Sequence, residues 1–253
     1  VGADGRDMTA VRAPAPGPGQ ANVPEGLVSA VVGLVGTGPV LLGAYTIAEL
    51  AAVDAIVDFL EARPSDEALA EAVRSLAARQ LIVAGPPGEQ VQVRGDLGIA
   101  VAFEQRARLV LDARATGIGP GEPWRVLLLP QPEQICLMFR IDTYGVHEIG
   151  LYKLDNALGM LADWLPKGPR ARPAEAADAD GLLAGCERSA LVTVTEYTTQ
   201  GSAEIAGDST DLVFVRHEGR LHLFSRDPDD RARLVPGPAE DRDVQDLLVG
   251  LLA

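Results

Sequence analysis

The spacing of apolar residues predicts helices in the first third of the chain. Apolar side chains recur every three or four positions over residues 47–60 and 66–81, which is the period of a helix that buries one face. Thr46 and Glu49 fit a capping box at the start of the first helix, and Pro64 ends it. We therefore expect two consecutive amphipathic helices in this region.

The neighbouring segments extend this helical part. Before the two helices, residues 27–35 predict an apolar helix, followed by a Gly-Pro turn and a buried strand. After them, two extended runs within residues 81–95 flank Gly85-Pro-Pro-Gly88 and predict a β-hairpin. Residues 99–115 have the length and composition of a helix. The order helix, helix, hairpin, helix resembles a winged-helix arrangement.

From residue 117 onward the pattern is mainly one of strands. Residues 117–124 form a Gly- and Pro-rich linker, and residues 166–181 are expected to form a mobile surface loop because they can bury little apolar surface. Leu-rich amphipathic helices are predicted over residues 154–165 and 243–253. The expected strands and strand pairs cover residues 125–130, 134–142, 147–154, 190–198 and 211–226.

This separation of helices from strands predicts an α+β fold, in which an antiparallel sheet has flanking helices and a winged-helix-like N-terminal part. We expect a disordered arm over residues 1–26, a mainly helical part over 27–116 and an antiparallel part over 117–253. Because VGADGRD precedes Met8, we expect the natural chain to start at Met8.

Composition narrows the possible partners. The chain has 253 residues, 47% of them apolar, which is enough to bury a sizeable core. Its formal net charge of −14 repels nucleic acid, so a nucleic-acid partner is not expected. Cys136 and Cys186 make no disulfide framework, and Cys136 lies in an apolar run typical of a buried small hydrophobe. With no secretory signal, we expect a cytoplasmic protein.

The stretch VVGLVGTGPVLLGA, residues 31–44, resembles a dinucleotide-binding turn. However, Leu41 stands where the third glycine after Gly36 and Gly38 belongs. Asp54 and Asp58, at the distance of a ribose-binding acid, fall within a predicted helix rather than at the end of a second strand. The pattern therefore argues against nucleotide binding.

The same region is long enough to suggest a membrane span. Residues 27–44 carry no charge, but their glycines and Pro39 weaken a helix, and they are flanked by Glu25 and Glu49 rather than by basic residues. We therefore expect no stable membrane span here.

No catalytic, cofactor-binding or metal-ligating residue can be assigned. The sequence has neither a G-x-S-x-G elbow nor a phosphate loop. His217 and His222 flank a predicted hairpin turn and could approach each other, as in a small-ligand enzyme, but a metal needs a third ligand and Glu218 should point to the opposite face. The remaining carboxylate pairs are expected to be solvated, or to form a turn at 208–211: Asp229/Asp230, Asp241/Asp243 and Asp208/Asp211.

Several phrases between residues 45 and 253 together resemble the EspG-type chaperones of type VII secretion. These phrases are Leu76-Ala-Ala-Arg79-Gln-Leu81 at the end of a helical segment, Leu165-Pro166 after a Leu-rich helix, Gly219-Arg220-Leu221 on a strand, and a terminal amphipathic helix. The resemblance implies a non-catalytic cytosolic protein with a central antiparallel sheet and two helical parts. It also implies a partner, the exposed apolar tip of a helical secretion substrate.

The sequence thus favours a protein-binding chaperone or adaptor, with a binding face that it does not identify. The alternative is an acidic winged-helix transcriptional regulator with an α+β effector domain, because the 76–81 phrase followed by a hairpin also fits a winged helix. Its recognition helix would be residues 66–80. Arg74 and Arg79 on that helix are outnumbered by acids, which disfavours contact with DNA.

Overall fold

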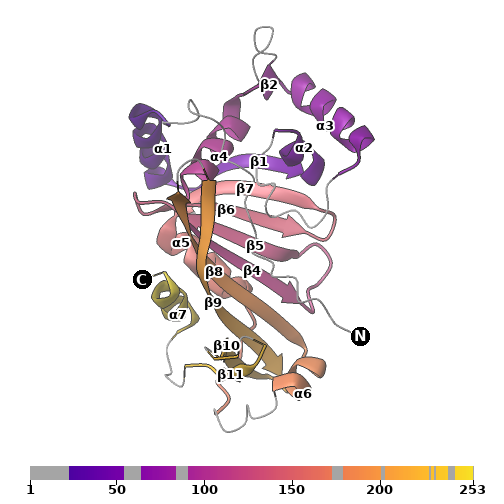
Figure 1. Cartoon of the computed structure of the whole chain (residues 1–253), viewed down its shortest axis with the longest axis vertical. Helices are drawn as coiled ribbons and strands as arrows, with labels where there is room; N and C mark the ends of the chain where they lie inside the picture. The colour runs from indigo at the N-terminus through magenta and orange to yellow at the C-terminus, as the bar shows by residue number, and fades with distance from the viewer. Residues whose placement is uncertain are drawn as a thin grey trace.

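A nine-stranded antiparallel sheet organises the described residues of the computed structural model (Figure 1). These residues are 23–53, 64–83, 91–172, 179–200, 203–227, 229–230, 232–238 and 243–252. The strand order is β1-β7-β6-β5-β4-β8-β9-β10-β11. The strands are β1 (Val40–Thr46), β4 (Leu109–Thr116), β5 (Pro123–Pro130), β6 (Ile135–Asp142), β7 (Val146–Lys153), β8 (Arg188–Gln200), β9 (Ala203–His217), β10 (Arg220–Arg226) and β11 (Leu234–Pro236).

Helices and a small hairpin surround this sheet in Figure 1. The hairpin pairs β2 (Ile82–Val83) with β3 (Gln92–Val93). The helices of the described residues are α1 (Glu25–Thr37), α2 (Ile47–Ala52), α3 (Asp66–Ala78), α4 (Gly95–Arg106), α5 (Leu154–Trp164), α6 (Ala179–Ala184) and α7 (Val244–Leu251).

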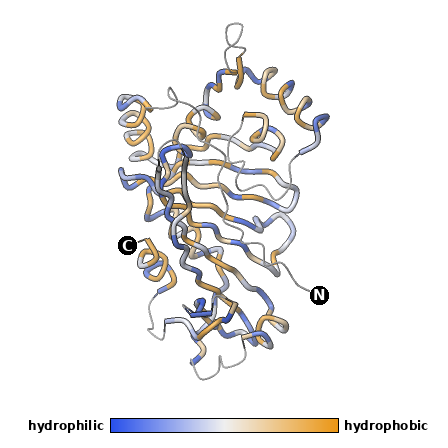
Figure 2. The backbone as a smooth tube through the Cα atoms, viewed as in Figure 1, coloured by the Kyte–Doolittle hydropathy of each residue, from blue (hydrophilic) through white to orange (hydrophobic). Residues whose placement is uncertain are grey.

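Two core layers lie on opposite faces of the sheet. On the α4 face, the buried side chains of Leu127, Phe139 and Ile149 pack with residues of α1, α2, α3 and α4. On the opposite α5 face, Leu128 and Met138 pack with residues of α5 and α7. Figure 2 shows hydrophobic positions along these central strands. Because both faces are covered, β5 and β6 are continuous apolar runs rather than alternating ones.

Two similar units build most of the sheet. Strands β5, β6 and β7 form a meander that ends in α5, and β8, β9 and β10 form a second meander that leads through β11 to α7. The two helices are neighbours, and Gln245 Nε2 donates a hydrogen bond to the Asp155 carbonyl at 3.2 Å. Strands followed by a Leu-rich helix therefore occur twice, and both helices lie on one face of the sheet.

The α+β fold with an antiparallel sheet and flanking helices is confirmed, as are the strands expected over 125–130, 134–142, 147–154 and 190–198. The hairpin over 211–226 is also present and turns at Glu218 and Gly219. The sheet takes β1 and β4 from the part expected to be mainly helical, and α4 packs against β1 and β6. The similarity to a winged helix stays a prediction for α2, α3 and the β2–β3 hairpin.

The single helix expected over 99–115 is wrong in its second half. Helix α4 ends at Arg106, and β4 begins at Leu109 as a central strand paired with both β5 and β8. Leu111, Ala113 and Ala115 are buried on one side of β4, whereas Asp112 and Arg114 point to the other. This alternation has the period of two that is typical of a strand. Pairing with a neighbouring strand on both edges stabilises the strand over the predicted helix.

Two loop predictions are also corrected. Residues 208–211 form no turn, because Ser209 pairs with Thr195 and Asp211 with Thr193 inside the long β8–β9 ladder. Within the expected loop 166–181, the Ala171 amide donates to the Leu221 carbonyl at 2.9 Å, and α6 begins at Ala179. Residues 173–178 of that loop lie outside the described residues, as do most of the arm, residues 54–63, and the hairpin turn 85–88.

The opening apolar stretch forms a helix, a Gly-Pro turn and a strand, as predicted. The order helix, turn, strand is the reverse of the strand, turn, helix order in a dinucleotide site. The strand itself departs from the prediction because β1 is an edge strand and only Leu42 and Tyr45 are buried along it. Its side away from β7 is paired with no strand of the described residues.

Candidate functional site

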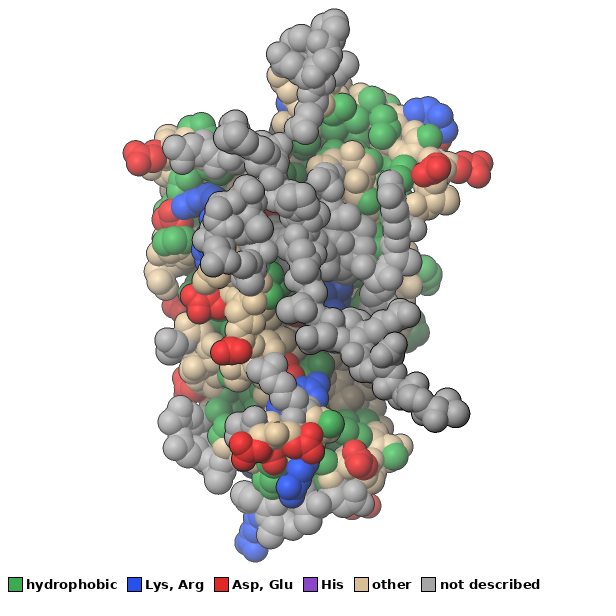
Figure 3. All heavy atoms as spheres, in the orientation of Figure 1, with side chains coloured by type: hydrophobic (Ala, Val, Ile, Leu, Met, Phe, Trp, Pro, Cys, Tyr) green, Lys and Arg blue, Asp and Glu red, His purple; other side chains and the backbone are tan. Residues whose placement is uncertain are grey.

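Exposed apolar side chains gather toward one end of the molecule. Leu34, Leu41, Val73 and Val91 lie between residues 34 and 91, and the other two large exposed apolar side chains of the described residues are Tyr144 and Val249. Figure 1 places α1, α3 and the β2–β3 hairpin at this end, with α1 and α3 on opposite sides of it, and Figure 3 shows hydrophobic side chains on both sides. We call Leu34, Val73 and Val91 the apolar end surface; they are 57%, 43% and 54% exposed.

A buried carboxylate holds α3 in place beneath this surface. Glu49 on α2 accepts hydrogen bonds from Ser75 Oγ at 2.8 Å and from Arg79 Nη1 at 3.0 Å, both contributed by the C-terminal part of α3 and its cap. It also accepts a bond from the Thr46 backbone N–H at 2.9 Å, which completes the predicted capping box. The Arg79 guanidinium stacks on the ring of Tyr45, 5.0 Å from its centroid. One side chain thus ties β1, α2 and α3 together.

The pKa of Glu49 reflects these contacts. Burial alone would raise the pKa of this carboxyl, but hydrogen bonds from Thr46 and Ser75 together with the charge of Arg79 outweigh that effect and lower it below the ordinary value of 4.5. Glu49 is therefore ionised at neutral pH and serves as an acceptor. It is not a candidate general acid.

The predicted recognition helix offers little positive charge. Arg74 is bound to Glu71 on the same helix at 2.7 Å, and Arg79 is bound to Glu49 at 3.0 Å. The basic side chains of α3 and of its C-cap are thus both paired with carboxylates of the same chain. A helix that reads DNA presents its cations to phosphates, so the geometry of α3 disfavours that role.

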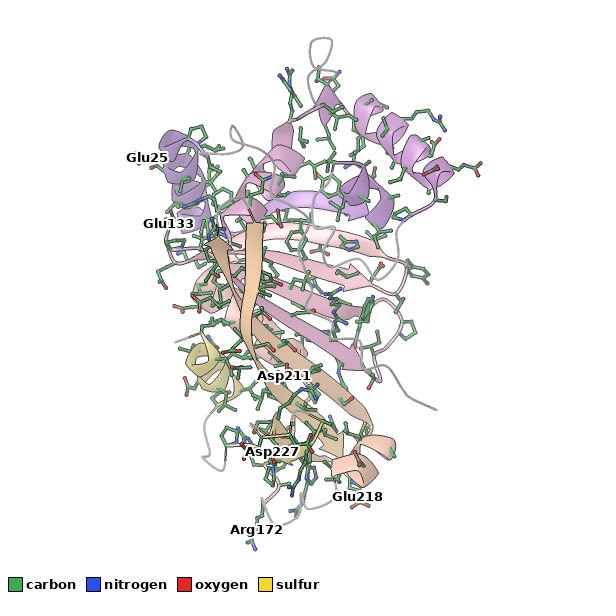
Figure 4. All side chains as sticks on the ribbon, viewed as in Figure 1. Glu25, Glu133, Arg172, Asp211, Glu218 and Asp227 are labelled. Carbon is green, nitrogen blue, oxygen red and sulfur yellow. The ribbon has the colours of Figure 1, made fainter. Side chains whose placement is uncertain are left out.

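A polar cluster crosses the middle of the sheet on the α4 face. Arg125, only 2% exposed, binds Asp112 through Nε at 2.8 Å and Nη2 at 2.7 Å, and Arg114 binds the same carboxylate at 3.0 Å. Two strands away, Asp211 accepts a bond from Thr193 Oγ1 at 2.6 Å and pairs with Arg226. Figure 4 labels Asp211 on its strand.

Cross-strand ion pairs in this cluster join β4 to β5 and β9 to β10, and the Thr193–Asp211 hydrogen bond joins β8 to β9. Each of its two carboxylates is bound by at least one arginine. The sequence did not predict this cluster, because the composition of residues 99–115 places Asp112 and Arg114 in a helix. The alternation of apolar and charged residues in LVLDARA was the available signal.

The histidines occupy two separate places. The rings of His217 and His222 lie 6.4 Å apart at the β9–β10 turn, close together as the sequence suggested. Within the described part of the chain, no group of three or more His, Cys, Asp or Glu side chains could hold a metal ion. His147 is buried on β7 with Nδ1 3.0 Å from the Gly145 carbonyl, and burial lowers its pKa.

The other described aspartates singled out in the sequence are exposed, and Cys136 is buried. Asp229, Asp230 and Asp243 are exposed, as expected, and Asp241 lies outside the described residues. Cys136 is fully buried, which confirms it as a small hydrophobe, and burial raises the pKa of its thiol to about 12.

The comparisons with known proteins add no family. No protein-family model matches the sequence, and no curated protein matches it. None of the helices over the described residues combines the length and the apolar character that a membrane crossing requires. The apolar end surface and the edge strand β1 therefore remain the features from which a role is argued.

Proposed function

We propose that this protein is a non-catalytic, cytosolic protein-binding chaperone or adaptor whose partner is a helical secretion substrate. The observation that carries the proposal is the apolar end surface, where Leu34, Val73 and Val91 are each more than two-fifths exposed. Large exposed apolar side chains at one end of a chain with a net charge of −14 are candidate contacts for a protein partner. The resemblance to the EspG-type chaperones gives the same class of partner.

The surroundings of this surface favour an apolar partner with basic residues at its margin. Glu25 begins α1, and Asp66, Glu67 and Glu71 lie on the first turns of α3. The chain as a whole has a net charge of −14. Complementary charge around an apolar contact speeds association and excludes wrong partners. An amphipathic helix that carries Lys or Arg beside its apolar stripe meets both requirements.

Removing the apolar end surface tests the proposal. The full chain with Leu34→Asp and Val73→Asp is compared with the wild type by affinity capture from the native cell and mass spectrometry. The matched control is Val249→Asp, which places the same charge on an exposed apolar position of α7. We expect a helical secretion substrate to co-purify with the wild type and the control, and to be lost from the double variant.

Two results would contradict the proposal. One is that no helical secretion substrate is recovered with the wild type under gentle lysis. The other is that capture is equal for the double variant and the wild type. A gel-shift assay at low salt, where attraction to phosphate is strongest, separates the proposal from a DNA-binding role; retarded DNA would favour the transcriptional regulator instead.

A further inference from the structure

The edge strand β1 has one hydrogen-bonding side that no described residue of another element occupies. It is the outermost strand of the sheet and pairs only with β7. Leu41 is 65% exposed, and Gly43 and Ala44 are exposed beside it. Over the described residues, the backbone of Val40–Tyr45 is hydrogen-bonded to no element other than β7, and the Leu42 carbonyl also accepts a bond from the Tyr45 hydroxyl at 2.8 Å. An open edge of this kind is a template for a further strand.

The two edges of the sheet differ in how they are protected. Strand β11 at the opposite edge has only three residues and ends in Pro236, both of which discourage a further strand. Strand β1 has seven residues, VLLGAYT, without a charge or a proline. Its one irregularity is a bulge at Gly43, whose φ of +115° suits glycine and whose missing side chain leaves room for the Tyr45 ring.

The charge distribution indicates which strand fits this edge. Residues 26–48 contain no charged side chain, although the chain carries a net charge of −14. Two copies therefore repel each other across most of their surfaces but not across β1. Two antiparallel copies of one strand also present N–H groups to C=O groups by symmetry, as an isologous contact requires.

We propose that β1 is a self-association edge, at which two copies of this chain pair their β1 strands antiparallel around a twofold axis. Leu41 of each copy then loses its exposure against the other copy. A contact built on one seven-residue strand is smaller than the roughly 1,200–2,000 Å² of a stable interface, so the dimer is concentration-dependent. This contact does not use the apolar end surface and is independent of the proposed partner.

Sedimentation equilibrium of the purified full chain tests the proposal from micromolar to hundreds of micromolar concentration. We expect the mass to rise from 26.6 kDa toward twice that value. Raising the salt concentration should strengthen the dimer, because salt screens the repulsion between two acidic chains and there is no ion pair at β1 to weaken. Amide exchange over residues 40–46 should slow as the concentration rises.

Leu41→Lys is the decisive variant, and Val249→Lys is its matched control. Placing a charge on the edge and removing the apolar contact of Leu41 should raise the dimer dissociation constant by about 10- to 100-fold. The control should leave it unchanged. Circular dichroism checks folding, and Ala44→Lys, beside Glu148 of β7, is a second edge variant that the fold can accommodate.

The proposal is overturned if the wild type stays at 26.6 kDa at all concentrations and salt levels, or if dimers survive both edge variants. A monomeric protein would leave the β1 edge to a strand of a different chain.

Discussion

Replacing Glu49 with glutamine should lower the free energy of unfolding more than a substitution on the exposed surface of α3, because Glu49 binds α3 to α2 and β1. Both carboxylate oxygens are used: one accepts from Ser75 and Arg79, and the other from Thr46. Glutamine keeps one acceptor oxygen but places an NH₂ group against donors on the other side. The substitution therefore leaves at least one buried donor facing another donor.

The size of the effect follows from these contacts. A hydrogen bond to a charged group contributes about 1.5–3 kcal/mol, and a partly exposed partner such as Arg79 contributes less because water screens it. We expect Glu49→Gln to lower the free energy of unfolding by about 2 kcal/mol. For a chain of this length that corresponds to a fall in Tm of about 4–8 °C.

The effect of Glu49 on stability should depend on pH in a defined direction. Because the folded pKa of Glu49 lies below its ordinary value of 4.5, its contribution is complete above that pH and is lost as the pH falls through the folded pKa. The wild type and the variant should therefore differ most at neutral pH. Their difference should shrink in acid, where both side chains are neutral.

Thermal unfolding followed by circular dichroism measures this difference at neutral and acidic pH. The control is Glu71→Gln on α3, whose ion pair with Arg74 is exposed, so it should change stability by less than about 0.5 kcal/mol. Equal Tm values for wild type and Glu49→Gln at neutral pH would refute the reasoning. A difference of constant size down to strongly acidic pH would refute the assignment to the ionised carboxylate.

Three further predictions concern a buried arginine, two glycines in different surroundings and a buried thiol. Arg125→Met leaves Asp112 without its buried partner and should lower the free energy of unfolding by about 3–5 kcal/mol in guanidinium chloride titrations. Gly117 has φ +67° and no room for a Cβ, so Gly117→Ala should destabilise by about 1–3 kcal/mol, whereas Gly33→Ala, with open space on α1, should stabilise by about 0.5–1 kcal/mol. With its pKa raised to about 12, the Cys136 thiol should not react with a disulfide reagent at neutral pH until the chain is unfolded.

The sequence predicted best where local signals and tertiary packing agree. The capping box at Thr46 and Glu49 and the hairpin turn at 218–219 depend on contacts between neighbouring residues, and both are present. Residues 109–115 show the opposite case. Their composition suits a helix, but pairing with β5 and β8 on both sides makes them a central strand.

The candidate surfaces were harder to predict because they depend on what remains uncovered. Leu41 lies in an apolar run, and the sequence alone indicates burial for such a residue. Its exposure results from the position of β1 at the edge, which depends on pairing with a strand much later in the chain. The Glu49 network likewise needs Ser75 and Arg79 from another helix, and their sequence separation hides that proximity.

The position of β1 also has a consequence for the order of folding. Val40 pairs with Leu151, more than one hundred residues later, whereas β5, β6 and β7 are joined by short turns. During synthesis the N-terminal strand must wait until β7 has left the ribosome before it gains a neighbour, while the β5–β7 meander can close at once. Until β7 is synthesised, the uncharged strand β1 is exposed to other chains. The protein is therefore most vulnerable to aggregation during its synthesis.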